Sequence, residues 1–432
     1  MSLLMEHAKL LLRSREGWHT LEDAYLGVKG DKIAYIGAEP PADRYDARKS
    51  MAGKLVMPGL VNCHCHSPMV LLRGKGSGLP LREWLFDTIF PIEARLTRED
   101  VAAASRYALL ELIAGGTTSF SDMYFFPEET VRAVEEAGVR ANLNRLVQSF
   151  DDEQRPEDNA QIGESLALFD EFDGAADGRV RIDFCIHAEY TCKSRIVRAY
   201  SELCAQRGGR MHLHLSETER EVRECEARYG MTPVAWFASL GTFASPTAAA
   251  HCVALREGDF DLLARHGVSA VHNPTSNMKL GSGFAPVPEL LARGVNVALG
   301  TDGAASNNNL NLFEEMHLAA LLHAGYRRDP TAVSCAQVLD MATVNGARAQ
   351  GRGDTGLLEV GKKADLIALD LTRAHLFPDF DTGALVVYSA QAGDVCLTMA
   401  DGKILYENGE FLTLDRERVS ADFARALQRL YG

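Results

Sequence analysis

The pattern of hydrophobic and polar positions changes twice along the 432 residues of this chain. Its middle part alternates helical segments with short apolar segments of the kind that form buried strands. One unit begins with the capping-box spacing of Thr97 and Asp100, continues as a helix rich in Ala and Leu to Ala114, and leads into a strand over 117–120. The succession recurs, with helices expected over 260–266 and 288–293 and strands over 139–147, 268–272 and 295–299.

These repeated units indicate the fold class. Apolar strands that alternate with helices over roughly 290 residues imply parallel βαβ units, and we count about eight of them. Eight units favour a closed (β/α)8 barrel, and the alternative is an open doubly wound sheet. We therefore predict an α/β protein built on a TIM-like barrel.

Both ends of the chain consist of short strand-like segments broken by Gly and Asp. These segments are 24–28 and 33–36 near the start, and 365–369, 395–399 and 403–406 near the end. Neither end is large enough to bury a core of its own. We expect residues 58–354 to form the barrel, while residues 1–57 and 355–432 pair into one small β-sandwich domain.

Composition narrows the classes of function. The chain is 46% hydrophobic and 24% charged, which is typical of a globular protein. Its formal net charge of −14 argues against a nucleic-acid partner, because nucleic-acid-binding proteins present a basic face. The N-terminal residues do not resemble a signal peptide, and no apolar run reaches about 18 residues, so no membrane association is expected.

The nine cysteines are scattered without a repeating spacing. An odd number of cysteines in a long chain indicates free thiols, and we therefore expect a cytoplasmic protein. The sequence leaves the oligomeric state open, with a homo-oligomer among the alternatives.

Candidate chemistry lies at the ends of four predicted strands. They carry His64 and His66, His212 and His214, His251, and Asp302. Because a barrel gathers its active site at the carboxyl ends of its strands, these groups can meet around one ion. Three imidazoles and one carboxylate suit zinc, with iron or manganese as alternatives. No strand-end lysine calls for a second, bridged ion, so we expect one divalent ion that lowers the pKa of a bound water toward ~7, and hence a hydrolase. Glu217 is placed to touch that water without being a ligand.

Each motif by itself has another explanation. Alternate residues of a strand share one face, so Cys63 and Cys65 form a second pair that can face an ion in place of the histidines. Either His212 or His214 can be a hydrogen-bonded core residue. Asp302 can cap a helix or a turn. Spacing alone therefore leaves the ligand set open.

Taken in order, the motifs resemble those of the amidohydrolase superfamily, and within it the 5-methylthioadenosine/S-adenosylhomocysteine deaminases. The matching segments are MPGLVNCHCH at 57–66, LREWL at 81–85, PIE at 91–93, HLSE at 214–217, AHC at 250–252, HNPTSN at 272–277, GTDG at 300–303 and GKKADL at 361–366. The resemblance therefore extends over nearly the whole chain.

The resemblance implies the barrel, the composite β-sandwich and a single divalent ion. It also implies the ligands, which would be His64, His66, His214 and Asp302. Among the catalytic residues, Glu217 would carry a proton to the purine ring nitrogen, and His251 would hold and help to deprotonate the attacking water. Asp302 would take part in the proton transfer. Attack at C6 of the adenine would expel ammonia, as in other nucleobase deaminases.

The resemblance further implies a set of substrate contacts, namely Trp84, Glu93, Arg145, Arg155, His187 and Glu217. Trp84 would pack against the nucleoside, and His187 matches a histidine that contacts it. Glu93 would accept hydrogen bonds from the ribose hydroxyls, because a carboxylate offers acceptors to both. Arg145 and Arg155 fall near positions that bind a homocysteine carboxylate, a group that suits the fork of a guanidinium. The alternative for both is an exposed surface pair.

The chain departs from the family pattern near His187. The family often has a proline where this chain has Glu189, and we expect this carboxylate to change the loop and the charge near the substrate. The segment 147–159 also differs in length, which affects the placement of Arg155.

The predicted activity is hydrolytic deamination of an adenine nucleoside, with 5-methylthioadenosine, S-adenosylhomocysteine and adenosine as candidate substrates. The alternative is a related aminohydrolase or chlorohydrolase that acts on a guanine-type base, a pterin or a triazine. Trp84 and Glu93 favour a nucleoside, because a free base has no ribose for Glu93 to bind. A non-catalytic relative that uses the barrel as a scaffold is a third interpretation, and the presence of Glu217 and His251 argues against it.

Overall fold

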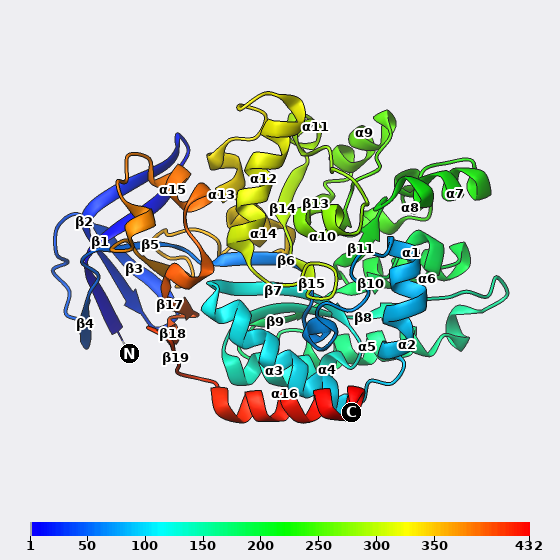
Figure 1. Ribbon diagram of the computed structural model, residues 1–432, viewed down its shortest axis with the longest axis horizontal. Helices are drawn as coiled ribbons and strands as arrows, with labels where there is room; N and C mark the ends of the chain where they lie inside the picture. Colours follow the sequence, from blue (N-terminus) through cyan, green and yellow to red (C-terminus); the bar gives the residue numbers. More distant parts are fainter. Residues whose placement is uncertain (1) are drawn as a thin grey trace.

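The computed structural model describes residues 2–432 and contains a barrel with a second sheet beside it (Figure 1). The barrel strands are β6 (Leu60–His66), β7 (Thr117–Tyr124), β8 (Arg140–Val147), β9 (Val180–Ile182), β10 (Phe184–Ile186), β11 (Met211–Leu215), β12 (Thr247–His251), β13 (Ser269–His272), β14 (Asn296–Leu299) and β15 (Asp302–Gly303). Each is paired in parallel with its neighbours.

The barrel is closed by the shortest strand. β15 follows β14 after two residues and pairs with β6, so that Asp302 lies opposite Cys65. The ten strands occupy eight positions, because β9 and β10 share one and β14 and β15 share another. The predicted (β/α)8 barrel is therefore confirmed, and the open doubly wound sheet is excluded.

Helices cover the outside of the barrel. The longer ones are α3 (Arg98–Ala114), α4 (Pro127–Ala137), α5 (Ala160–Phe172), α6 (Ser194–Gln206), α7 (Glu219–Tyr229), α8 (Pro233–Ser239), α9 (Glu257–Arg265), α11 (Val287–Ala292), α12 (Leu312–Arg327), α13 (Cys335–Ala342) and α14 (Val344–Ala349). The predicted capping box is present in α3: Thr97 accepts from the Asp100 N–H, and the Asp100 carboxylate accepts from the Thr97 N–H. Gly138, with φ of 87°, ends α4.

Short helical turns lie in the connections. They are η1 (Ser67–Leu72), α1 (Leu81–Glu83), η2 (Trp84–Ile89), α2 (Phe90–Glu93), η3 (Pro156–Asp158), η4 (Glu189–Thr191), η5 (Thr242–Ala244) and α10 (Pro274–Lys279). The turns from η1 to α2 all belong to the connection that follows β6. This connection places Trp84 and Glu93 beside the strand ends.

Both termini contribute to the second sheet. Its strands are β1 (Ser2–Ser14), β2 (Gly17–Lys29), β3 (Lys32–Gly37), β4 (Ala47–Ser50), β5 (Lys54–Pro58), β16 (Leu366–Asp370), β17 (Val395–Ala400), β18 (Lys403–Glu407) and β19 (Glu410–Phe411). The antiparallel pairing of β5 with β16 joins the N-terminal strands to the C-terminal ones. At the other edge, the Ile33 N–H donates to the Lys362 carbonyl at 2.9 Å, so the sheet curls around its own apolar core.

The C-terminal part is divided between the two bodies. Besides its strands it contains η6 (Ala374–Leu376), α15 (Thr382–Tyr388), η7 (Ala392–Asp394) and α16 (Arg416–Tyr431). Helix α16 runs along α3 of the barrel, where Phe423 stacks on Tyr107 with ring centroids 3.9 Å apart (Figure 1). The domain boundaries at residues 57 and 354 stay a prediction, and α16 lies outside the β-domain that we expected for 355–432.

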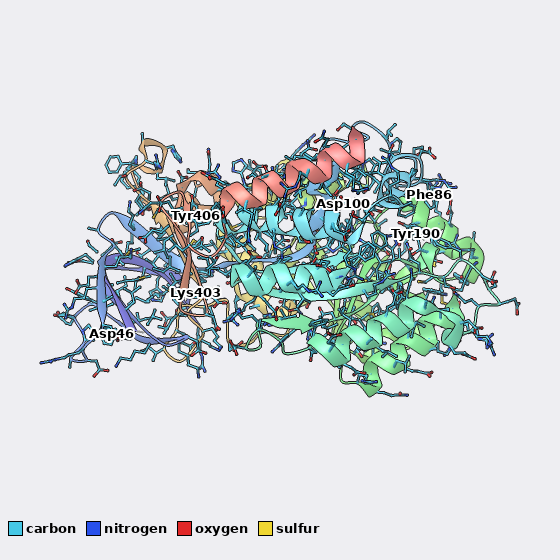
Figure 2. The ribbon with its side chains drawn as sticks, turned by 90° about the horizontal axis from the view of Figure 1, so that it is seen from below. Asp46, Phe86, Asp100, Tyr190, Lys403 and Tyr406 are labelled. Atoms are coloured by element: carbon cyan, nitrogen blue, oxygen red, sulfur yellow. The ribbon has the colours of Figure 1, made fainter. Side chains whose placement is uncertain are left out.

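The barrel and the second sheet lie side by side along the long axis of the molecule. Figure 2 shows Asp46 and Lys403 at the end that contains the second sheet, and Phe86 and Tyr190 toward the opposite end. Within residues 2–432, no helix is long and apolar enough to cross a membrane.

Candidate active site

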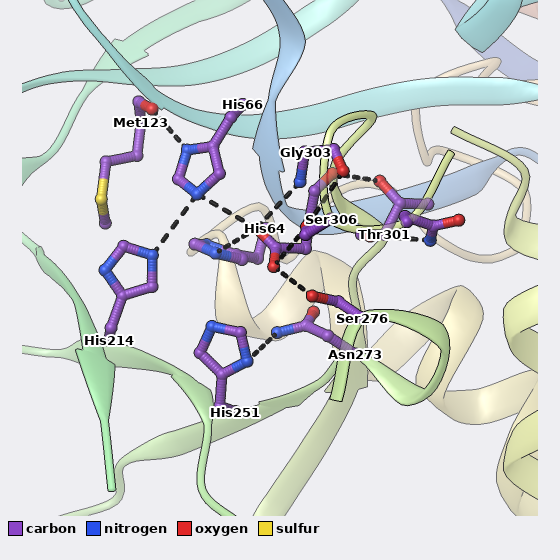
Figure 3. Close-up of polar contacts among 12 residues, drawn as sticks. His64, His66, Met123, His214, His251, Asn273, Ser276, Thr301, Gly303 and Ser306 are labelled. Atoms are coloured by element: carbon purple, nitrogen blue, oxygen red, sulfur yellow. Dashed lines mark hydrogen bonds and ion pairs between the residues drawn. The ribbon is translucent and has the colours of Figure 1, made fainter. Parts of the chain in front are cut away.

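Four side chains converge at the carboxyl end of the barrel strands (Figure 3). β6 supplies His64 and His66, β11 supplies His214, and β15 supplies Asp302. Asp302 Oδ1 lies 3.1 Å from His66 Nε2 and 3.4 Å from His64 Nε2. The Nε2 atoms of His66 and His214 are 3.4 Å apart. The four residues are buried, and we refer to them below as the ligand cluster.

Two of these imidazoles are oriented by their other ring nitrogen. His66 Nδ1 donates to the Met123 carbonyl at 2.6 Å, and His214 Nδ1 donates to the His187 carbonyl at 2.7 Å. Because a carbonyl oxygen only accepts, each Nδ1 carries a hydrogen, and each Nε2 faces the cluster, where it can bind a proton or, in place of the proton, a cation. The tautomers therefore suit ligation of a cation.

The alternatives that spacing left open lie outside the ligand cluster. His212 Nε2 is 3.0 Å from His64 Nδ1, so His212 supports the ring of His64 from behind. Cys63 Sγ lies 3.4 Å from the Gly346 carbonyl. Across the described chain, the groups of side chains that can hold an ion include neither Cys63 nor Cys65.

The charges of the cluster fit a bound cation. His64 Nε2 is buried without a hydrogen-bond partner, and burial lowers the pKa of His64 to about 4, which keeps the ring neutral. Burial also opposes a charge on His66, but hydrogen bonding to Asp302 and the Asp302 charge outweigh it and raise the pKa of His66 to about 9. The two imidazoles hold the pKa of Asp302 well below its usual range in spite of burial. Three imidazole nitrogens around an ionised carboxylate are a donor set that binds zinc and related divalent ions.

Sharp turns at the strand ends aim these groups. Ser216, His251 and Asp302 have φ values of 49°, 76° and 61°, in the left-handed region that costs a residue with a side chain about 1–3 kcal/mol. Ser276 and Ser306 donate to Asp302 Oδ2 at 2.6 and 2.9 Å. These bonds secure one carboxylate oxygen, while Oδ1 faces the imidazoles.

Glu217 and His251 lie beside the ligand cluster. Glu217 Oε2 is 3.7 Å from His251 Nε2, and the Ser282 hydroxyl donates to Glu217 Oε1 at 3.0 Å. His251 Nδ1 donates to Asn277 Oδ1 at 2.8 Å, so His251 Nε2 is free to act as a base. Burial raises the pKa of Glu217, although the nearby His251 opposes the shift. A carboxyl group that keeps its proton more readily than usual is suited to general acid–base work.

A cavity of about 60 Å³ opens onto these groups. Trp84, Glu93 and His187 line it together with His66, His214, Glu217, His251 and Asp302. Burial raises the pKa of Glu93 to about 7, partly offset by the nearby Tyr124 hydroxyl. His187 Nδ1 lies 3.0 Å from the Thr191 hydroxyl, and burial lowers the pKa of His187 to about 3. Four of the expected substrate residues, Glu217 among them, therefore share one cavity with His251 and Asp302.

The two arginines lie elsewhere. Arg145 lines an adjoining cavity, and its Nε donates to Glu164 at 2.7 Å. Arg155 lines neither cavity: it is more than half exposed and pairs with Asp158 at 2.7 Å. The expected placement of Arg155 at the substrate is corrected accordingly, because the acidic residues of its own loop hold it at the surface.

Glu189 does not bring its charge to the substrate. Its carboxylate is buried and accepts from Arg228 Nη2 at 2.6 and 2.9 Å, and it does not line the cavity. Burial raises the pKa of Glu189 although Arg228 opposes the shift. Arg228 therefore neutralises the negative charge that we expected Glu189 to add near the substrate.

Several supporting residues were not identified from the sequence. Glu221 accepts from the N–H groups of Ser216 and Glu217 at 3.0 and 2.7 Å, and so holds the turn that carries Glu217. Glu221 could have been identified from its position on the first turn of α7, because a carboxylate there can accept from N–H groups at the end of the preceding strand. Asn277 belongs to a motif that we noted without assigning a role. No local sequence pattern identifies Ser282, because it contacts Glu217 only once the loop that carries it has folded.

Comparisons with known proteins agree with this geometry. The model of the amidohydrolase family matches residues 55–405. A 5-methylthioadenosine/S-adenosylhomocysteine deaminase of Caldanaerobacter subterraneus subsp. tengcongensis is 43% identical over 431 residues, which cover 100% of this chain and 99% of that protein. A 5'-deoxyadenosine deaminase of Methanosarcina mazei is 45% identical over 403 residues, which cover 93% of this chain and 92% of that protein.

A solved structure supports the same assignment. The crystal structure of an adenosine deaminase from Xanthomonas campestris with bound zinc has a TM-score of 0.92 and 34% identity, covering 99% of this chain and 98% of that one. The chain therefore belongs to the amidohydrolase family, whose members are metal-dependent hydrolases. This confirms the family that the motifs indicated.

Proposed function

We propose that the protein deaminates an adenine nucleoside, with water and the nucleoside as substrates and the inosine analogue and ammonia as products. The observation that carries this proposal is the position of Glu217 and His251 beside the ligand cluster, in one cavity with Glu93. A proton carrier, a water-binding base and an acceptor for ribose hydroxyls are then within reach of one bound nucleoside. The relatives named as nucleoside deaminases support the same substrate class.

In this proposal His64, His66, His214 and Asp302 would hold a single divalent ion, with zinc as the proposed metal and iron or manganese as alternatives. These four residues are divided between two groups able to hold an ion, which share His64, and the group with Asp302 also contains His251. When bound, such an ion supplies Lewis acidity that makes water a nucleophile near neutral pH. His251 Nε2 faces the cluster and would hold the attacking water, while its Nδ1 stays bonded to Asn277.

Side chains of the protein would then transfer the protons of the reaction. As the water oxygen bonds to C6, Glu217 would donate a proton to ring nitrogen N1, and His251 and Asp302 would accept a proton from the water. Cleavage of the bond between C6 and the exocyclic nitrogen requires that a proton reach this nitrogen, which leaves as ammonia. The raised pKa of Glu217 suits a group that must hold and return a proton.

The remaining cavity residues would bind the nucleoside. Glu93 would accept hydrogen bonds from the ribose diol, Trp84 would pack against the nucleoside, and neutral His187 would offer its free Nε2. Glu217 would contact the base directly. We do not extend this role to Arg155, because it lines neither cavity.

We also propose that the protein acts in a reducing compartment, the cytoplasm. All nine cysteines are free thiols, and seven of them are buried. Buried, unpaired thiols fit a compartment in which disulfides do not form.

Ammonia release tests the proposed activity. The purified, zinc-loaded protein is mixed separately with 5-methylthioadenosine, S-adenosylhomocysteine, 5'-deoxyadenosine and adenosine, and ammonia is measured together with the spectral change of the purine. We expect turnover of at least one nucleoside. Turnover of a guanine-type base, a pterin or a triazine, with none of the nucleosides, would refute the proposal.

A further inference from the structure

A second cavity adjoins the catalytic one and shares part of its wall. Phe90, Glu93, Phe125 and Gln148 line both. The second cavity is larger, with a volume of about 910 Å³. Glu93, on this shared wall, is the proposed acceptor for the ribose diol. A substituent on C5' of that ribose would therefore extend out of the catalytic cavity near the shared wall.

Both aromatic and charged side chains line the second cavity. Six phenylalanines line it: Phe86, Phe90, Phe125, Phe126, Phe150 and Phe172. Three arginines also line it, and each has a carboxylate partner within the protein. Arg98 and Arg132 pair with Glu129, and Arg145 pairs with Glu164. The aromatic rings can therefore pack against an apolar group, while none of these guanidinium groups is left without a counter-ion.

Arg145 lies on β8, three residues before Gln148, which belongs to the shared wall. Its guanidinium lies 5.8 Å from the Phe125 ring centroid and is only 15% exposed. Nε donates to Glu164 at 2.7 Å, and Nη1 donates to the Leu146 carbonyl at 3.1 Å. Because Nε is bonded to Glu164, a ligand carboxylate would have to displace Glu164 to bind the Nε and Nη2 edge of Arg145 bidentately.

We propose that the second cavity receives the 5' substituent of the nucleoside, and that Glu164, by occupying Arg145, selects uncharged substituents over those that carry a carboxylate. This inference rests on the proposed function. It assigns specificity to Glu164, on α5, rather than to Arg145 alone. Methylthio and 5'-deoxy nucleosides are the class that fits, because their 5' groups meet aromatic rings and leave the ion pair intact.

The test compares nucleosides whose 5' groups differ in whether they carry a carboxylate. Values of kcat/KM are measured for 5-methylthioadenosine, for S-adenosylhomocysteine and for its deamino analogue, which keeps the carboxylate but has no ammonium group. In the wild type we expect a preference of about tenfold or more for the methylthio compound, because the carboxylate would leave water for a site beside Glu164 with no free guanidinium to pair with. Equal use of the deamino analogue by the wild type would overturn the proposal.

Glu164→Gln provides the decisive variant. It frees Arg145, so kcat/KM for the deamino analogue should rise about tenfold relative to the methylthio compound. Glu164 is half exposed, so the substitution leaves the core unchanged. The double variant Glu164→Gln with Arg145→Met should return the ratio to its wild-type value. An unchanged ratio in Glu164→Gln would overturn the proposal, as would a selective loss of the carboxylate substrate in Arg145→Met alone.

Glu171→Gln is the matched control. Glu171 lines the same cavity, and no ion pair of Glu171 occurs within the described residues. Its substitution removes the same charge without freeing an arginine, so we expect less than a twofold change in the ratio. A rise equal to that in Glu164→Gln would show that net charge decides the preference, and would also refute the role of Glu164. Absence of ammonia from every nucleoside with the wild type would instead count against the proposed function.

Discussion

Replacement of Glu217 by Gln separates proton transfer from metal binding. Gln has nearly the same shape as Glu, and the backbone N–H of residue 217 keeps its hydrogen bond to Glu221 at 2.7 Å. The nearest imidazole to the carboxylate is His251, at 3.7 Å, and Glu217 is outside the groups of side chains that can hold an ion. The Glu217→Gln variant should therefore fold and bind the metal as the wild type does.

The expected loss of activity follows from the missing proton carrier. An amide neither donates a proton to N1 nor returns one to the leaving group, and a positioned general acid–base contributes about 10²–10⁴-fold to a rate. At about 1.36 kcal/mol for each factor of ten, this corresponds to a barrier raised by about 3–5 kcal/mol. KM should change little, since Gln still offers a hydrogen bond to the base.

The assay measures metal content and steady-state kinetics on the same preparations. Metal per chain is determined for the wild type and Glu217→Gln, and kcat and KM are measured from ammonia release. Ser282→Ala is the matched control: it removes the donor to Glu217 Oε1 but leaves the carboxylate, so we expect a loss of about tenfold or less. Loss of the metal in Glu217→Gln would identify Glu217 as a ligand, and activity within a few-fold of the wild type would mean that another group carries the proton.

Three further predictions concern residues around the cluster. His212→Ala removes the support of the His64 ring and should weaken ion affinity about 10–100-fold, measured by competition with a chelator, and an unchanged affinity would contradict the supporting role. Asn277→Ala removes the acceptor for His251 Nδ1 and should lower kcat about tenfold with metal content and KM unchanged, whereas parallel loss of the metal would make His251 a ligand. For Glu93, burial raises the pKa from 4.5 to about 7, so the folded protein binds this proton more tightly than the unfolded chain does. The stabilisation is complete below pH 4.5 and is lost as the pH rises through 7, so the wild type should lose about 3 kcal/mol of unfolding free energy relative to Glu93→Gln across that range. Urea unfolding at several pH values measures this difference, and a constant difference would show that Glu93 ionises normally.

Much of the fold was accessible from the sequence. The helix that begins after Thr97 and the strand that begins at Thr117 are set by local signals, namely a capping box and a β-branched run that follows two glycines. The strand proved longer than expected and extends to Tyr124. A parallel strand is buried on both faces, so its sequence does not alternate between apolar and polar residues, and no pattern marks its end. The closing strand β15 has only two residues and could not be recognised by any periodic pattern.

Residues in loops were predicted less well than residues at strand ends. His64, His66 and Asp302 stand at fixed places on a rigid barrel, so a strand-end position implies a position in space. Arg155 and Glu189 stand in connections, where a neighbouring charge decides the direction of the side chain. Asp158 holds Arg155 at the surface, and Arg228 neutralises Glu189 in the interior.

The sequence by itself determined the barrel, the two-ended second sheet, and the few residue types able to bind an ion, because these depend on periodicity and on the chemistry of side chains. It could not decide between His64 and Cys63, or between His212 and His214, since both members of each pair satisfy the same local spacing. The tertiary structure decided which member of each pair faces the point where the strand ends meet. Closure of the ring by β15 brings Asp302 to the same point as His66 and His214, and only groups that face that point can share an ion.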